Sequence, residues 1–218
     1  PIPDEMESDI DLLTRCLLAP FGFATTGSEL AYRFHLMTLG DKPHITVTSP
    51  QPNRVVMTYD FPENSRAAEV KDGRAKMAKA ESGLVDCWLL ARAGDGTPSA
   101  DLLAYANAYM NRSSVALISD VLTVKAPTIR NYQIRMKLHG SNSPGGIIDP
   151  APVKAQLEAY AEGARQLEGI IDPGRLYAIA HGLQTVVRAE LLEPPAPIIC
   201  AVSEAPYCTG VEVEVVYD

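Results

Sequence analysis

The segment Tyr132-Gln133-Ile134-Arg135-Met136-Lys137-Leu138 carries the clearest secondary-structure signal in the sequence. Every second residue is apolar and the residues between them are polar, which predicts a β-strand with one buried face and one wet face. The segment from Val121 to Val124 lies shortly before it. We expect the two segments to pair across a turn at Ala126-Pro127-Thr128, which places this strand inside a sheet.

A strand and a helix are predicted before this pair. The apolar segment from Leu84 to Ala93 reads as a strand, and Gly94-Asp95-Gly96 ends it with a turn. Thr97 and Pro98 are typical of a helix N-cap and first turn, so an amphipathic helix should follow. The residues expected on its buried face are Leu102, Ala106 and Tyr109.

Two helices and a strand are predicted after the pair. Asp149-Pro150 starts a long helix, Asp172-Pro173 starts a shorter one, and Thr185 to Leu192 returns as a strand. The helical residues expected to face the core are Val153, Leu157, Ala161 and Ala164 in the first helix and Leu176, Ile179 and Leu183 in the second.

The order of elements predicts the fold class. From Leu84 to Leu192 it is β-α-β-β-α-(α)-β, the split βαβ arrangement of ferredoxin-like folds. We therefore predict an α+β protein in which one antiparallel sheet is covered by helices on one face. A small helical and β segment precedes this unit.

That N-terminal segment is predicted to hold two short helices and two strands. Ser8 is the expected N-cap of a helix from Met6 to Leu18, and a second helix should begin at Ser28 and end at Gly40. In the second helix Leu30, Phe34 and Met37 recur at helical spacing. The strands are expected at Ile45 to Thr48 and at Val55 to Tyr59. The predicted organisation is thus an N-terminal α+β segment over residues 1–60, a basic stretch over residues 61–83, and a ferredoxin-like domain with the C-terminal strand over residues 84–218.

The basic stretch has the composition of a solvated helix or a mobile loop, because its charges stand among alanines. It holds few aromatic residues and includes Glu69 and Asp72, which disfavours a grip on nucleic acid. A solvated face and a surface for an acidic protein partner both remain open. The candidate interface residues are Arg66, Lys71, Arg74, Lys76 and Lys79.

The last predicted strand is a second candidate interface. Val211, Val213 and Val215 alternate with Glu212 and Glu214. An exposed strand edge can be paired by a neighbouring protein, so these valines are candidate partner-interface residues. An ordinary internal strand with one wet face is the alternative.

Composition excludes several classes of protein. The chain has 218 residues, of which 46% are hydrophobic and 21% charged, so it can bury a substantial core. Its formal net charge of -8 argues against an extended contact with nucleic-acid phosphates. It has no apolar run approaching the roughly 18 residues of a transmembrane helix and no secretory signal. We expect no nucleic-acid partner, no membrane insertion, and synthesis in the cytoplasm.

The residue types that carry chemistry do not converge on a reaction centre. His35 and His181 read as helical residues, and His44 and His139 lack Cys, Asp or Glu at metal-ligand spacing. Neither glycine-rich segment has the spacing that wraps a phosphate. Buried thiols are preferred over a disulfide or a metal site for Cys16, Cys87, Cys200 and Cys208. We predict no catalysis, no metal and no cofactor.

An ordered series of motifs resembles the phage baseplate assembly protein J family. The series runs over nearly the whole chain and is more specific than any of its members. It includes Met6-Glu7-Ser8-Asp9, Gly27 to His35, Thr48-Ser49-Pro50, Gly94-Asp95-Gly96-Thr97, Asp120 to Val124, Ala159 to Gly169, Leu176 to His181, Val186 to Leu191 and Glu204 to Val213. Three features depart from the family pattern. Residues 61–83 look like an insertion, Ala116-Leu117 stands where an Arg-Pro pair is common, and we expect the chain to lack the family's N-terminal helical region.

This resemblance implies a structural wedge subunit of a contractile tail baseplate, as in P2-like and Mu-like phages. Such proteins associate with copies of themselves, with a second wedge protein and with hub or sheath-proximal tail proteins. The implied location is the tail baseplate of the virion, after assembly in the bacterial host cytoplasm. A wedge protein of a related contractile injection system or tail-like bacteriocin is one alternative, and a small-molecule-binding module on a ferredoxin-like scaffold is another.

Overall fold

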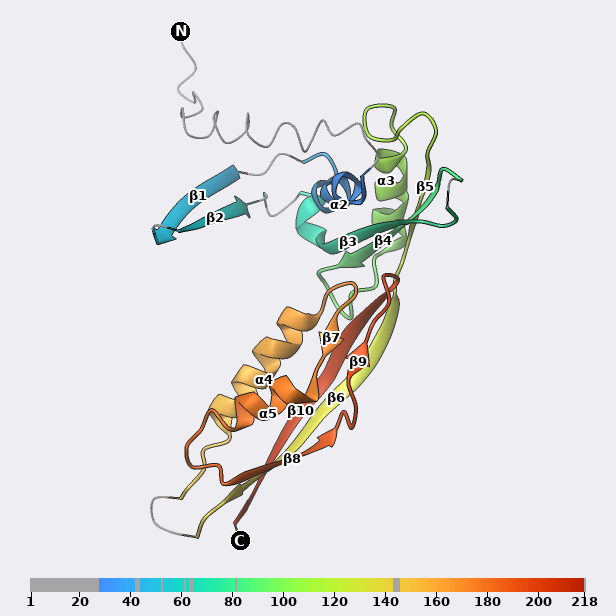
Figure 1. Cartoon of the computed structure of the whole chain (residues 1–218). Helices are drawn as coiled ribbons and strands as arrows, with labels where there is room; N and C mark the ends of the chain where they lie inside the picture. Colours follow the sequence, from blue (N-terminus) through green and yellow to red (C-terminus); the bar gives the residue numbers. More distant parts are fainter. Residues whose placement is uncertain are drawn as a thin grey trace. The chain divides into compact units, whose positions relative to one another are not determined.

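The chain divides into two compact units. The computed structural model describes residues 28–41, 44–51, 53–60, 62, 65–80, 82–142 and 146–217 (Figure 1). Unit 1 comprises Pro1–Gly94 and Pro98–Ala126, and unit 2 comprises Asp95–Thr97 and Pro127–Asp218. The predicted helix from Met6 to Leu18 and Cys16 lie outside the described residues. The division falls at Ala126, inside the predicted 84–218 domain, and not at residue 83.

The described part of unit 1 combines a three-stranded sheet, two α-helices and a separate hairpin. Its sheet has the order β3-β4-β5, with β3 antiparallel and β5 parallel to β4. The hairpin pairs β1 with β2. The elements of unit 1 are α2 (Glu29–Thr38), β1 (His44–Gln51), β2 (Arg54–Asp60), the 3-10 helix η1 (Ala67–Glu69), β3 (Val70–Met77), β4 (Leu84–Ala91), α3 (Ala100–Met110) and β5 (Val121–Lys125).

Helix α2 has the predicted ends but a different buried face. The Ser28 hydroxyl accepts a hydrogen bond from the Ala31 N–H, and Leu39 ends the helix in the left-handed conformation. The buried face holds Tyr32 and Leu36, whereas Leu30 is 70% exposed. Leu30, Phe34 and Met37, which recur at helical spacing, therefore do not make up the buried face. The row of residues centred on Tyr32 and Leu36 packs on the sheet instead.

Helix α3 buries the three residues predicted for it. Leu102, Ala106 and Tyr109 lie in the core of unit 1, although the N-cap is Ser99 and not Thr97. Two asparagines at the end of the helix bind the backbone of β5. The Asn111 amide donates to the Leu122 carbonyl over 2.8 Å, and the Asn107 side-chain oxygen accepts from the Val124 N–H over 3.1 Å.

Strand β5 does not pair with β6, so the predicted hairpin across Ala126-Pro127-Thr128 is wrong. It lies parallel to β4, with Leu84 opposite Val121. The physical reason is the helix between β4 and β5, because a long crossover allows two strands to lie parallel. Pro127 begins the longer segment of unit 2.

The basic stretch forms ordered structure and not a solvated helix or a mobile loop. It contains η1 and β3, and β3 pairs with β4 from Val70 to Met77. Gly73 and Ala75 are buried under α2, which packs closely on this strand. The alternation of small and charged residues was thus a strand pattern, which the abundance of alanine obscured.

Unit 2 contains a second three-stranded sheet, of order β10-β6-β8, with β10 parallel and β8 antiparallel to β6. A short antiparallel pair, β7 and β9, stands beside it. The elements of unit 2 are β6 (Thr128–Gly140), α4 (Ala151–Ala164), β7 (Ile170–Ile171), α5 (Pro173–Ala180), β8 (Arg188–Glu193), β9 (Ile198–Ile199) and β10 (Glu204–Tyr217).

The alternating segment forms a strand with one buried face, as predicted, and it is the central strand of the three-stranded sheet of unit 2. The Tyr132, Ile134, Met136 and Leu138 side chains are buried, and the helices α4 and α5 cover this face of the sheet (Figure 1). The core residues that the helices contribute include Val153, Leu157, Ala161, Leu176 and Ala180.

The α+β class is confirmed, whereas the single antiparallel sheet is wrong. The strands predicted for that sheet are divided between β3-β4-β5 and β10-β6-β8, and each of these sheets contains one parallel pair. The ferredoxin-like arrangement is therefore not confirmed. The last strand, β10, pairs with β6, for which Val121 to Val124 was the expected partner.

Candidate interaction surfaces

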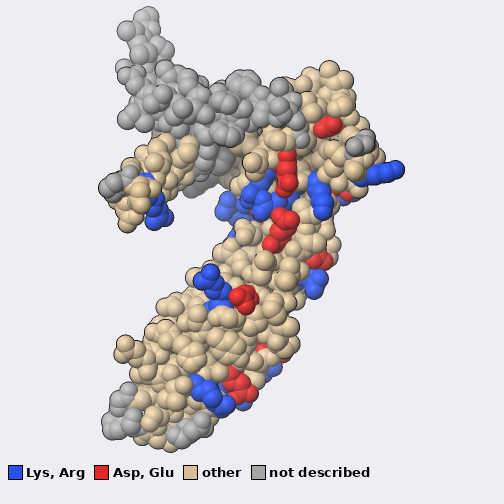
Figure 2. Space-filling model, in the orientation of Figure 1, with Lys and Arg blue, Asp and Glu red and all other residues tan. Residues whose placement is uncertain are grey.

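The five basic candidates lie on and beside β3 of unit 1. Arg66 precedes η1, Lys71, Arg74 and Lys76 lie on β3, and Lys79 follows β3. On the face shown in Figure 2, Lys and Arg alternate with Asp and Glu in small groups. The use of these residues as a surface for an acidic partner stays a prediction.

Arg66 is occupied by contacts inside unit 1. Its guanidinium binds Asp101 at 2.6 Å and Glu69 at 3.1 Å, and it lies 5.5 Å from the centre of the Tyr105 ring. Lys71 and Arg74 are half-buried, whereas Lys76 and Lys79 are exposed. Lys76 and Lys79 are thus the basic candidates with the most accessible side chains.

The three valine candidates point into the core of unit 2. Val211 is 9% exposed, and Val213 and Val215 pack against the same apolar cluster. Their side chains therefore contribute to stability, and a partner on this strand would meet its backbone. The apolar alternation identified the strand correctly, but it marked the face turned away from solvent.

Strand β10 forms an edge of its sheet. It pairs with β6 from Glu204, opposite Thr128, to Tyr217, opposite Gly140, and within the described residues no strand pairs with its other side. A bulge at Thr209 interrupts the ladder, and the Thr209 hydroxyl donates to the Tyr132 carbonyl over 3.1 Å. Half of the backbone N–H and C=O groups of an edge strand point outward and can accept another strand.

The outer face of this sheet carries ion pairs that sequence reasoning missed. Arg135 lies between Glu212 at 3.1 Å and Glu193 at 3.6 Å, and Lys137 lies 3.5 Å from Glu214. The pairs join β6 to both neighbouring strands, because residues directly opposite each other share a face. The alternating charges of the two long strands, β6 and β10, are visible in the sequence, but the pairing of these strands is not.

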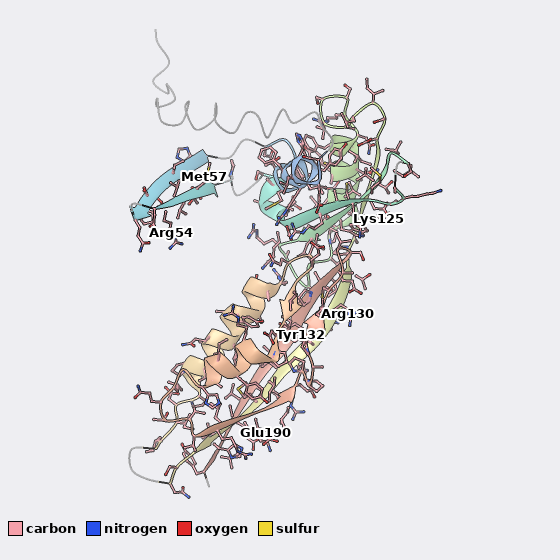
Figure 3. All side chains as sticks on the ribbon, in the orientation of Figure 1. Arg54, Met57, Lys125, Arg130, Tyr132 and Glu190 are labelled. Carbon is pink, nitrogen blue, oxygen red and sulfur yellow. The ribbon has the colours of Figure 1, made fainter. Side chains whose placement is uncertain are left out.

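A histidine and an arginine are in contact on the same face of the sheet. The His139 ring is 8% exposed and lies 2.9 Å from the Arg188 guanidinium. The Glu190 carboxylate is 3.6 Å from the same ring, and Figure 3 shows Glu190 on β8. These contacts satisfy groups within the fold and do not form a metal or nucleophile site.

Burial shifts the pKa values of Cys87, Cys200 and His35. It raises the pKa of the Cys87 thiol to about 12, with a smaller contribution from Asp86, and it also raises the pKa of Cys200. Cys87 and Cys200 are buried, as predicted, whereas Cys208 is half-buried. Burial lowers the pKa of His35, whose Nδ1 lies 3.0 Å from the Tyr109 hydroxyl.

No described cluster of His, Cys, Asp and Glu residues could hold a metal ion. Two open hollows lie beside α4. One is about 260 Å³ and is lined by residues of α4 and β10 that include Glu158, Ala161 and Cys208. The other is about 390 Å³ and lies near Tyr160, Gly163 and Ile170. Neither hollow is a deep pocket with convergent polar groups. No described helix is long and apolar enough to cross a membrane.

The class of protein follows from comparison with known proteins. No family model matches the chain. A curated relative, the baseplate protein J of Escherichia phage P2, is 30% identical over 210 residues. The match covers 96% of this chain and 59% of the relative. It confirms the resemblance to the baseplate J family, and the chain spans a little over half the length of this relative.

Proposed function

We propose that the chain is a structural component of a contractile-tail baseplate wedge and acts through protein interfaces. The similarity to baseplate protein J over nearly the whole chain carries this proposal. The chain spans 59% of that relative, so the partners and the location in the virion are part of the proposal. The role requires no catalysis and no cofactor, and the protein would be assembled in the host cytoplasm.

The free edge of β10 supports an assembly role. The strand is 14 residues long, and its opposite edge is fully engaged with β6. Long unpaired edges promote unwanted association unless they are covered or protected. The bulge at Thr209 and the exposed Glu212 and Glu214 side chains give partial protection. An edge of this kind suits a protein that meets other wedge, hub or sheath-proximal proteins only in a defined complex.

The exposed lysines are the second element of the proposal. Lys76 and Lys79 lie at the end of β3 and in the turn after it, where their side chains reach solvent. They would contact an acidic surface of a second wedge protein. Reversal of both charges should weaken such a contact and leave the fold intact, because neither residue is in the core of unit 1.

Co-expression with the tail proteins encoded beside this chain tests the proposal. We expect the chain to elute from a size-exclusion column in a complex with a second tail protein. The molar mass of that complex, measured by light scattering, should correspond to a fixed number of subunits. Lys76→Glu/Lys79→Glu should reduce the yield of that complex. The matched control is Lys154→Glu, an exposed change on α4 outside both candidate surfaces. Failure to associate with any tail protein would contradict the baseplate role.

A further inference from the structure

The β1–β2 hairpin is exposed over nearly its whole surface. Among the side chains that the structure describes in these strands, only Val56 is half-buried, and the others are exposed. Three of the exposed residues are large and apolar: Val47, Val55 and Met57. A two-stranded hairpin is marginally stable in water, and independent stability requires three or more strands or a packed face. The hairpin therefore has the properties of an incomplete sheet.

The register gives the hairpin two different faces. Val47 lies opposite Met57, and Val55 shares their face because it is two residues from Met57. The other face carries Thr46 opposite Thr58, His44 opposite Asp60, and Thr48 opposite the half-buried Val56. One side is thus apolar and the other mainly polar, which is the pattern of a sheet with one face that can be buried.

The two edges of the hairpin differ in their ability to accept another strand. Strand β1 contains Pro50, which has no N–H and blocks strand pairing at its position. Strand β2 runs from Arg54 to Asp60 without a proline. The available edge is therefore that of β2, and Figure 3 shows Arg54 and Met57 on this strand.

The charges of β2 are arranged symmetrically about its centre. The strand has seven residues, with Arg54 at one end, Asp60 at the other and Met57 in the middle. If this strand meets a copy of itself in the antiparallel direction with Met57 opposite Met57, each Arg54 lies opposite an Asp60. Opposite charges in direct cross-strand positions are stabilising, and like charges are destabilising. A parallel pair in register would place Arg54 beside Arg54.

We propose that β2 pairs with β2 of a second copy of this chain, antiparallel, about a twofold axis at Met57. The product is a four-stranded sheet in the order β1-β2-β2-β1, which exceeds the number of strands that a stable sheet requires. Val47, Val55 and Met57 of both copies then share one continuous apolar face. The contact is isologous, so it closes at two copies and leaves β10 available to other proteins.

This inference goes beyond the proposed function. It concerns a different strand and follows from the register and charge pattern of the hairpin, so it holds whether or not the chain acts in a baseplate. Its test uses the isolated chain, whereas the baseplate role is tested with other tail proteins. The two failures are therefore distinguishable.

A charge-exchange experiment tests the pairing. Arg54→Asp places like charges at both ends of the shared ladder, as does Asp60→Arg, and each variant should associate about tenfold more weakly than the parent chain. The double variant Arg54→Asp/Asp60→Arg restores both attractive pairs and should recover dimer. Residues 54 and 60 are about 20 Å apart along one strand, so this recovery cannot arise within one copy.

Mixing the two single variants provides a stricter test. The Arg54→Asp chain carries two acidic ends and the Asp60→Arg chain two basic ends, so a mixed dimer has only attractive pairs. Sedimentation velocity should show two weakly associating samples that form a dimer when combined. Circular dichroism of each variant checks that the fold is kept.

Disulfide trapping locates the axis. Directly opposite residues in an antiparallel pair have Cα atoms about 4.5–5.5 Å apart, which lies within disulfide reach. Met57→Cys should therefore give a covalent dimer under mild oxidation. The matched control is Val55→Cys, which is more exposed than Met57. Its two copies would lie about 13 Å apart in this register and should remain unlinked.

Three results would overturn the inference. One is a parent chain that stays monomeric up to about 100 μM, because a dimer with a dissociation constant of about 100 μM or below would be detected at that concentration. Another is a folded double variant that associates as weakly as the single variants. The third is Val55→Cys linking as readily as Met57→Cys, which would indicate random collision or another register.

Discussion

At the scale of single residues, polar contacts anchor α2 to unit 1. The Arg33 guanidinium lies 2.9 Å from the Asp72 carboxylate, whose side chain is only 4% exposed. The Tyr32 hydroxyl donates to Asp120 over 2.6 Å, and burial together with this carboxylate raises the pKa of Tyr32. Both contacts join residues far apart in the sequence, so each depends on the packing of the apolar core.

Asp72→Ala should lower the free energy of unfolding by about 2–3 kcal/mol. Loss of one partner from a fully buried pair costs about 3–5 kcal/mol, and the 31% exposure of the Arg33 side chain reduces that value. Urea unfolding measures the change. The matched control is Asp101→Ala, which removes an exposed partner of Arg66 and should have a much smaller effect. Equal effects would contradict the structural importance of the buried pair.

His35 should make stability depend on pH. Burial lowers its pKa below the usual value of 6.5, so the folded state binds a proton less readily than the unfolded state. The contribution to stability is complete above pH 6.5 and declines as the pH falls through the lowered folded pKa. His35→Gln should therefore lose less stability than the parent chain between pH 7 and pH 5. Parallel unfolding curves for the two proteins would argue against this assignment.

At the scale of elements, a glycine permits the close contact between α2 and β3. A Cβ added at Gly73 would lie 2.7 Å from the Leu36 Cβ, so the helix would have to move away from the strand. Gly73→Ala should lower the melting temperature, because overpacking typically costs about 1–3 kcal/mol. Thermal unfolding by circular dichroism measures the shift.

Gly163→Ala is the matched control for that prediction. Gly163 lies in α4, and a Cβ there would meet no atom within 4 Å. Alanine favours a helix by about 0.5–1 kcal/mol over glycine, so this variant should be more stable than the parent chain. A similar loss of stability in both variants would indicate that the spacing between α2 and β3 is not the cause.

Local patterns were sufficient to predict most elements. The alternation in β6, the inner residues of α3 and α4, and the Asp172 cap of α5 are all as predicted. These features depend on neighbouring residues, and short-range periodicity records them. Pairing between distant strands has no such record, which explains the wrong partner for β5 and the missed position of β10 beside β6.

The candidate surfaces were less predictable than the fold. The sequence marked the valines of β10 as candidate interface residues, but Val211, Val213 and Val215 face the core. It grouped five basic residues by proximity in sequence, whereas Arg66 pairs with Asp101 from α3. The exposure of a side chain depends on which helices and strands cover it. A cluster of charges in the sequence does not show which elements these are. The hairpin edge at β2 was missed because it becomes visible only when the register is known.

At the scale of the whole molecule, the chain consists of two units with separate cores. Each unit has its own sheet and apolar cluster. Outer strands of the described sheets include β10 in unit 2 and β2 in unit 1, and we propose that each contacts a different neighbour. The chain matches baseplate protein J over 210 residues, which include both units.

We propose that this chain assembles with tail proteins through the free edge of β10. Hydrogen–deuterium exchange of the chain, alone and in complex with co-expressed tail proteins, tests this assembly most directly. We expect the amides of Glu204–Tyr217 to exchange markedly more slowly in the complex, while the amides of β6, which lies between two strands, change little. A complex in which the exchange of β10 is unchanged would contradict the claim.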